Sequence, residues 1–254
     1  MSKKIVIANW KMNPIREKEA EKLFVNINKI VSSLKNTEVI ICPPVIYLKK
    51  LKAISYKLKA KLGVQNCFYE ESGAYTGEIS ATMVYELGAR YTILGHSERR
   101  AMGEKSDDVN KKIKSALSEG IIPIICIGEK ERDENHKYLA FVKEQIEVGF
   151  KNIPKEALSK IIIAYEPVWA IGKNATREAT PEEFLEMRIF IKKVLSMMFG
   201  VKNKIPRIIY GGSADEKNVL DFVKNGEADG FLVGRASLDP KKFSNIINTI
   251  ENIS

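Results

Sequence analysis

The sequence predicts a closed (β/α)8 barrel, an α/β fold in which parallel strands alternate with helices in one domain over residues 1–254. Eight short apolar runs are mostly continuous rather than alternating, which is typical of parallel strands covered on both faces. Longer amphipathic, charged stretches lie between them. Eight strands in 254 residues match the usual size of such a barrel, and no linker or change of composition marks a second domain.

A doubly wound open sheet is the alternative arrangement of alternating strands and helices. Such a sheet usually carries a glycine-rich turn after its first strand. Here the first strand leads into Asn9-Trp10-Lys11, and neither a GxGxxG motif nor a Walker P-loop occurs in the sequence. The closed barrel is therefore the better interpretation.

The expected strands are short runs in which β-branched residues are frequent. In chain order they are Ile5–Ala8, Val39–Cys42, Gly63–Gln65, Tyr91–Leu94, Pro123–Ile127, Ile161–Tyr165, Arg207–Tyr210 and Gly230–Val233. Amphipathic stretches predict helices at Lys18–Leu34, Asp108–Glu119, Lys137–Phe150, Pro181–Met198 and Ser213–Asn225. Two of these helices have start signals, since Asp107 precedes one and Thr180, followed by a proline and two glutamates, precedes another.

Composition excludes several classes of protein. Hydrophobic residues make up 44% and charged residues 29% of the chain, which argues against disorder, a collagen-like repeat and a disulfide scaffold. The sequence has three cysteines and no CxxC pair: Cys42, Cys67 and Cys126. The chain has only two histidines, His96 and His136, that could complete a metal site with them. We therefore expect no metal site, and reduced thiols in a cytoplasmic protein. The N-terminus does not resemble a signal peptide, and no apolar run approaches the roughly 18 residues that span a bilayer.

The net charge of +9 is compatible with nucleic acid, anionic lipid or an anionic small substrate as a partner. The lysines, however, are scattered over expected helix surfaces, and no arginine-rich run with interleaved aromatic residues occurs. We therefore expect a solvated, lysine-rich surface, with neither a nucleic acid nor a membrane as partner.

Polar residues gather just after the expected strands, and in such barrels the active site lies on the loops at the carboxyl ends of the strands. A single polar residue at a strand end is an ordinary loop residue, but several around one mouth favour a reaction site. The candidates are Asn9, Lys11, His96, Ser97, Glu98, Glu166, Ser213 and Arg235.

Glycines after the last two strands indicate where an anion would bind. Gly211-Gly212 and Gly234 allow backbone N–H groups to approach an anion closely, and the start of a helix adds its positive dipole end. A tight strand-to-helix turn is the simpler explanation. Many barrels of this class nevertheless hold phosphate after strands seven and eight, which favours a phosphate site.

The segment Glu166–Gly172 is unusually apolar for a surface loop and ends in glycine. A lid that excludes water from the carboxylate at its base would have this composition. A buried hydrophobic connection between a strand and a helix would have it equally well, so the segment by itself leaves both interpretations open.

Six segments in order make the chain resemble the triosephosphate isomerase family along nearly its whole length. They are Ala8–Asn13, Gly73–Ser80, Leu94–Arg100, Cys126–Glu129, Ala164–Gly172 and Tyr210–Ser213. The resemblance implies the interconversion of dihydroxyacetone phosphate and D-glyceraldehyde 3-phosphate, a small phosphorylated sugar substrate, no metal and no organic cofactor.

The resemblance also implies roles for the residues at the mouth. Glu166 would move a proton between adjacent carbons, and His96 would polarise the carbonyl as a neutral electrophile. Ser97 would begin a short helix whose positive end favours the neutral imidazole. Lys11 would stabilise negative charge, and Asn9 would orient the substrate.

Further residues would support these groups. The resemblance assigns the phosphate to Gly172, Ser213, Gly234 and the backbone N–H of Arg235, and it makes Glu98 the partner that positions Lys11. The segment around Thr76 resembles the family's dimer loop, so the resemblance implies a homodimer in which Thr76 supports the partner's Lys11 or Asn9.

Two departures from the family pattern surround the site. The stretch from Lys173 to Thr180 is longer than the usual link between lid and helix, and Arg235 stands where the family usually has glycine. An isomerase of a four-carbon ketose phosphate, such as erythrulose phosphate, would keep the acid–base groups and change these loops. A non-catalytic barrel that binds phosphometabolites or nucleic acid is the third possibility, against which the intact base and electrophile argue.

Overall fold

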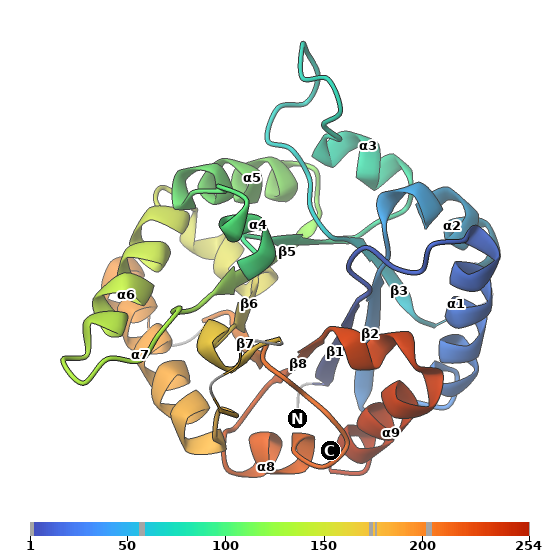
Figure 1. Ribbon diagram of the computed structural model, residues 1–254. Coiled ribbons are helices and arrows are strands. Elements are labelled where there is room, and N and C mark those ends of the chain that lie inside the picture. The colour runs from blue at the N-terminus through green and yellow to red at the C-terminus, as the bar shows by residue number, and fades with distance from the viewer. Residues whose placement is uncertain (1–2, 56–58, 173–174, 176, 202–204, 254) are drawn as a thin grey trace.

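Eight parallel strands pair in chain order and close into a barrel, since β1 pairs with both β2 and β8 (Figure 1). The protein is described by a computed structural model that covers residues 3–55, 59–172, 175, 177–201 and 205–253. The strands are β1 (Lys4–Asn9), β2 (Thr37–Cys42), β3 (Lys61–Val64), β4 (Tyr91–Leu94), β5 (Ile122–Ile127), β6 (Ile162–Tyr165), β7 (Arg207–Tyr210) and β8 (Gly230–Val233). The predicted (β/α)8 barrel is confirmed.

Helices surround the strands as an outer ring, except for α4, which lies inside this ring in Figure 1. They are α1 (Glu17–Val31), α2 (Leu48–Ser55), α3 (Ala81–Glu86), α4 (Ser97–Ala101), α5 (Ser106–Ser118), α6 (Lys137–Gly149), α7 (Pro181–Phe199), α8 (Val219–Lys224) and α9 (Pro240–Glu251). Short 3-10 helices lie at η1 (Val45–Tyr47), η2 (Lys155–Lys160), η3 (Val168–Ala170) and η4 (Arg235–Leu238). No helix among the described residues combines the length and the apolar character needed to cross a membrane.

The predicted strands agree with the observed ones to within two residues at each end. The helix predicted over Ser213–Asn225 was wrong at its start, because α8 begins only at Val219. Asp215 Oδ1 accepts hydrogen bonds from the backbone N–H groups of residues 217 and 218, at 2.9 and 3.1 Å, and so stabilises a turn before the helix. The helices α2, α3 and α9 were not predicted.

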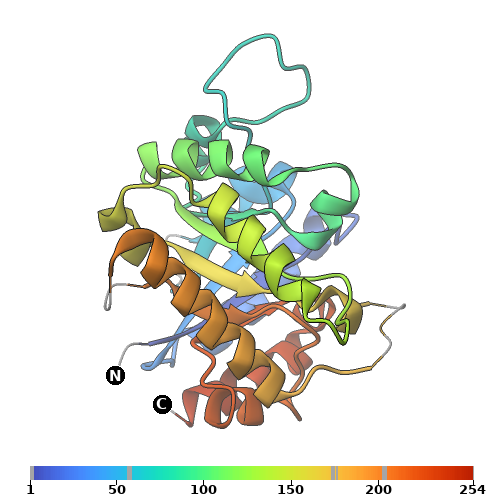
Figure 2. The same cartoon turned by 90° about the vertical axis from the view of Figure 1, so that its left-hand side faces the viewer.

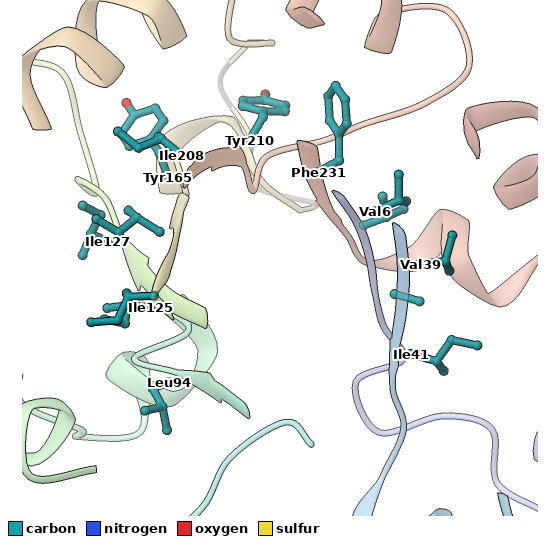
Figure 3. Packing of buried hydrophobic residues seen from close by; sticks show 14 of the residues in the cluster. Val6, Val39, Ile41, Leu94, Ile125, Ile127, Tyr165, Ile208, Tyr210 and Phe231 are labelled. Carbon is teal, nitrogen blue, oxygen red and sulfur yellow. The ribbon is translucent and has the colours of Figure 1, made fainter. Parts of the chain in front are cut away.

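The core has two layers separated by the strands. Side chains alternate along a strand, so each strand supplies residues to both layers. Residues such as Val6, Ile41 and Phe231 point away from the barrel axis and pack beneath the helices (Figure 3). Their neighbours, including Ile5 and Ile7, fill the barrel interior with a second, mostly isoleucine cluster. The barrel is therefore a packed core and positions its functional groups at one end.

Candidate active site

In β5, β6 and β7 the inward-facing series of side chains continues one step past the strand and forms part of the floor of the site. In β6 the series Ile162, Ala164 leads to Glu166, which is 2% exposed. In β5 and β7 the corresponding residues are Gly128 and Gly211. A Cβ atom on Gly128 would lie 1.8 Å from the backbone oxygen of Glu166, and one on Gly211 would lie 2.9 Å from its Cγ. The glycines therefore leave the room that Glu166 occupies.

Glu166 contacts the segment after β4 through both carboxylate oxygens. Its Oε1 lies 3.2 Å from His96 Nε2, and its Oε2 accepts a hydrogen bond of 2.8 Å from the backbone N–H of Ser97. Burial, with the charge of Glu166 added to it, raises the pKa of the neighbouring Cys126 thiol well above its ordinary value. Cys126 therefore stays protonated beside the carboxylate.

His96 is held in one tautomer by its own helix. As the sequence predicted, Ser97 begins the short helix α4, and His96 is its N-cap residue. The backbone N–H of Glu98 donates to His96 Nδ1 at 3.2 Å, so Nδ1 carries the lone pair and the proton lies on Nε2. The ring is thus a neutral donor that faces Glu166, which suits an electrophile for a carbonyl oxygen.

Lys11 is fixed at the mouth by contacts with three other residues. Its ammonium group lies 2.5 Å from Glu98 Oε1, and its backbone N–H donates to Asn9 Oδ1 at 3.0 Å. The side-chain amide of Gln65 donates to the Lys11 carbonyl at 2.7 Å. These bonds hold Lys11 at φ 52°, a left-handed conformation that is costly for a residue with a Cβ.

A cavity of about 710 Å³ opens above these groups. It brings together most of the residues that the sequence singled out: Asn9, Lys11, His96, Glu98, Glu166, Gly172, Ser213, Gly234 and Arg235. Ser97 reaches the site through its backbone bond to Glu166. Among the described residues, no group of three or more His, Cys, Asp or Glu side chains is arranged to hold a metal ion.

The expected anion site lies along the wall of this cavity formed by β7 and β8. Ser213 Oγ donates to the Ala170 carbonyl at 3.3 Å, which joins the turn after β7 to the segment after Glu166. Gly234 precedes η4, and Ser237 Oγ donates back to the Gly234 carbonyl at 2.6 Å. Arg235 has no positive φ, so its place in the chain does not require glycine.

Comparisons with known proteins agree with this geometry. The profile of the family described as triosephosphate isomerase matches residues 4–250. The chain belongs to the triosephosphate isomerase family. Proteins named triosephosphate isomerase from Dictyoglomus thermophilum and Aquifex aeolicus are 42% and 41% identical to it, over 98% and 96% of this chain and 100% and 98% of theirs.

The fold agrees with a solved structure of the same family. The crystal structure of triosephosphate isomerase from Bartonella henselae has a TM-score of 0.84 and 34% identity, and the match covers 97% of this chain and 98% of that one. None of these relatives is named as an isomerase of a four-carbon sugar phosphate, so the alternative raised by the sequence gains no support from them.

Thr76 is the sequence-predicted site residue that the structure places away from the cavity. It lies in the loop between β3 and α3, which projects beyond the ring of helices (Figures 1 and 2). Residues 71–78 are exposed without interruption. The resemblance to the triosephosphate isomerase family assigned Thr76 to a partner's site, and within one chain it contacts none of the groups described above.

Sequence reasoning did not assign a role to Gln65 or Glu129. Gln65 follows Gly63 and so occupies the inward position that Asn9 has in β1, and counting alternate residues would have placed it at the mouth. Glu129 lies within a recognised family segment, but its partners, Tyr165 and Trp169, follow it by 36 and 40 positions. The pairing of β5 with β6 brings these three side chains together, and the spacing of the residues in the sequence does not reveal it.

Proposed function

We propose that Glu166, His96 and Lys11 carry the interconversion of dihydroxyacetone phosphate and D-glyceraldehyde 3-phosphate, the activity that membership of the triosephosphate isomerase family gives this protein. The observation that carries the proposal is the pairing of a buried carboxylate with a neutral imidazole donor, 3.2 Å apart, beside a fixed ammonium group. A carbon acid next to a carbonyl needs these three groups: a base, an electrophile and a cation.

In the proposed reaction, Glu166 removes a proton from C1 of dihydroxyacetone phosphate while His96 Nε2–H donates a hydrogen bond to the carbonyl oxygen. The electrons of the broken C–H bond form the enediolate, whose negative charge Lys11 stabilises. His96 then exchanges protons between the two enediolate oxygens, and Glu166 returns its proton to C2. Both oxygens of Glu166 are engaged by His96 and Ser97, so the carboxylate has to leave the Ser97 N–H before it reaches the substrate.

The phosphate is proposed to bind at Gly172, Ser213, Gly234 and the backbone N–H of Arg235, and Asn9 to orient the substrate. Backbone N–H groups beside glycine approach an anion closely. These residues border the same cavity as Glu166 and His96, so one small phosphorylated molecule would contact both groups of residues. The proposed substrate therefore lies with its phosphate at β7 and β8 and its reacting carbons over β6.

A Glu166→Asp variant tests the base. The shorter side chain withdraws the carboxylate by one methylene, so we expect kcat for glyceraldehyde 3-phosphate to fall by about a hundredfold or more while KM changes little. A four-carbon ketose phosphate assayed beside it should have a far lower kcat/KM with the parent protein. An unchanged kcat in the variant would remove Glu166 from the mechanism, provided that the melting temperature is also unchanged.

We also propose that the protein is a homodimer. Exposed apolar side chains lie on the loops and the helix that follow β1 to β4: Met12, Ile15, Ile46, Met83 and Met102. A second cavity, of about 380 Å³, is lined by Met12 and Met102 and lies beside Lys11 and His96. The projecting loop of a second copy, with Tyr75 and Thr76, is the proposed occupant. Light scattering should give a mass near twice 28.6 kDa, and a single-chain mass would contradict the proposal.

The three cysteines support a cytoplasmic location. Cys42, Cys67 and Cys126 are all buried free thiols, which suits a reducing compartment. Cell fractionation that recovers the protein outside the cytoplasm would contradict this assignment.

A further inference from the structure

The segment that follows Glu166 is anchored through Trp169, which is 8% exposed. The indole N–H donates to Glu129 Oε1 at 2.8 Å, and the backbone N–H of Val168 donates to the Glu129 carbonyl at 3.0 Å. Ile171 and Gly172, immediately after this anchor, border the active-site cavity. The position of Trp169 therefore fixes where the wall of the cavity stands.

Arg177 covers the indole ring of Trp169 from the other side of the segment. Its guanidinium carbon lies 4.4 Å from the ring centroid, within the range of a cation–π contact. Arg177 belongs to the stretch between Gly172 and α7, which the sequence analysis expects to be longer than in the family; residues 173, 174 and 176 of that stretch lie outside the described residues. This stretch thus places a cation on the tryptophan that anchors the cavity wall.

Arg177 is itself held by the start of α7. It donates to both oxygens of Glu183, at 2.9 and 2.5 Å, and to the carbonyl of Glu178 at 3.0 Å. Glu183 in turn accepts the Thr180 N–H at 2.9 Å, while its own N–H donates to Thr180 Oγ1 at 3.3 Å, and these two bonds form a capping box. Although its side chain is half exposed, Arg177 is a bridge between Trp169 and a fixed helix end.

We propose that Arg177 is a positioning residue that holds the segment 167–172 in the observed arrangement, by stacking on Trp169 and pairing with Glu183, and that a bound phosphate draws the segment out of this arrangement. Gly172, one of the proposed phosphate ligands, belongs to the same segment. If the segment moves toward a bound phosphate, Trp169 moves with it and its contact with Arg177 weakens. The inference rests on the proposed function, because the segment borders the proposed phosphate site. Without Arg177 the observed arrangement loses a stabilising contact, so a ligand that favours the displaced arrangement binds more tightly.

The experiment measures the affinity for inorganic phosphate by the fluorescence of Trp169. The chain has two tryptophans, so a Trp10→Phe background leaves Trp169 as the only reporter. In that background, Arg177→Gln should lower the phosphate dissociation constant by about two- to fivefold, the range expected for loss of one exposed cation–π contact. KM for glyceraldehyde 3-phosphate in the parent background should fall with it. An unchanged or raised dissociation constant would overturn the proposal.

Two further variants separate the stack from simple charge effects. Glu183→Gln keeps the capping box, because glutamine can replace glutamate in this motif, but it removes the negative charge that pairs with Arg177. Both Arg177→Gln and Glu183→Gln should tighten phosphate binding, whereas a purely coulombic effect on the anion would move the two in opposite directions. Arg90→Gln is the matched control, because Arg90 also stacks on an aromatic ring, Tyr85, at 3.9 Å, and lies outside both cavities described above. A shift of equal size in Arg90→Gln would likewise overturn the proposal.

The outcomes also separate this inference from the proposed function. If phosphate fails to bind to the parent protein, the proposed phosphate site is wrong. If phosphate binds to the parent and to Arg177→Gln equally, only the role of Arg177 is wrong. Arg177→Lys keeps the cation but loses the two-pronged pairing, and should give a dissociation constant between those of the parent and the glutamine variant.

Discussion

The two ends of the barrel follow the same alternation of side chains but place different residues at the inward positions. At the amino ends of β2, β3 and β4 these positions carry long polar side chains that pair with one another. Tyr91 OH donates to Glu38 Oε1 at 2.6 Å, and Lys61 Nζ donates to the same oxygen at 3.0 Å. Each of these groups therefore has its partner inside the protein.

At the carboxyl ends, the inward positions of β5, β7 and β8 are Gly128, Gly211 and Gly234. A cavity opens above them, and Glu166 and Lys11 border it. The difference teaches that pairing closes the amino end and stabilises the fold, whereas glycine keeps the other end open for a ligand. Polar residues at both ends look alike in the sequence, and the size of the neighbouring inward residues decides which end does chemistry.

The largest effect is expected when one glycine at the open end is filled. Gly211→Ala would place a Cβ atom 2.9 Å from Glu166 Cγ and 3.1 Å from the Tyr165 carbonyl oxygen, so the base has to move. Because a displacement of about 1 Å can cost a hundredfold in rate, we expect kcat to fall by about that factor. Gly149→Ala is the control, since its Cβ would meet nothing within 4 Å. Equal kcat values for the two variants would show that Gly211 does not position the base.

A change at the paired end should affect stability and spare the reaction. Glu38→Gln weakens the hydrogen bonds from Tyr91 and Lys61, and we expect the free energy of unfolding to fall by about 1–2 kcal/mol. Denaturant unfolding measures the loss, and steady-state kinetics should show an unchanged kcat. A fall in kcat without a loss of stability would contradict the claim that the amino end stabilises the fold and the carboxyl end carries the reaction.

The Glu38 carboxyl group should also make the stability of the fold depend on pH. Burial by itself would raise the pKa of Glu38, but the hydrogen bonds from Tyr91 and Lys61 and the charge of Arg207 outweigh it and lower the pKa below its ordinary value of 4.5. A carboxyl group with a lowered pKa stabilises the fold above pH 4.5 and loses that contribution as the pH falls through the folded-state value. Below pH 4.5 the parent should therefore lose stability more steeply than Glu38→Gln. Parallel pH profiles would be the contrary result.

The smallest effect is expected at Arg235, on the rim of the open end. Its side chain is exposed, so replacing it by glycine removes one screened charge near the proposed phosphate site. Arg235→Gly should raise the inhibition constant of inorganic phosphate by about two- to fivefold and leave kcat unchanged. A constant that does not move would show that the guanidinium group faces only solvent.

The strands were predictable because a buried parallel strand is a local pattern. Runs such as Ile162–Tyr165 and Gly230–Val233 are apolar on both faces, and both were predicted to within one residue. The Thr180 cap was predictable for the same reason, since all its partners lie within three residues. The predicted start of α8 was wrong because the side chains of Asp215 and Asn218 form hydrogen bonds with the backbone before the helix. The periodicity of apolar residues does not reveal such bonds.

By itself, the sequence determined the barrel, the order of its strands and the polar residues at their ends, because these follow from burial and from contacts between near neighbours. Tertiary structure decided which of those residues meet: His96 with Glu166, Lys11 with Glu98, and Arg177 with Trp169. The first two pairs are separated by 70 and 87 positions in the chain. Only closure of the sheet brings such distant segments to one mouth, where small inward residues leave a cavity for the substrate.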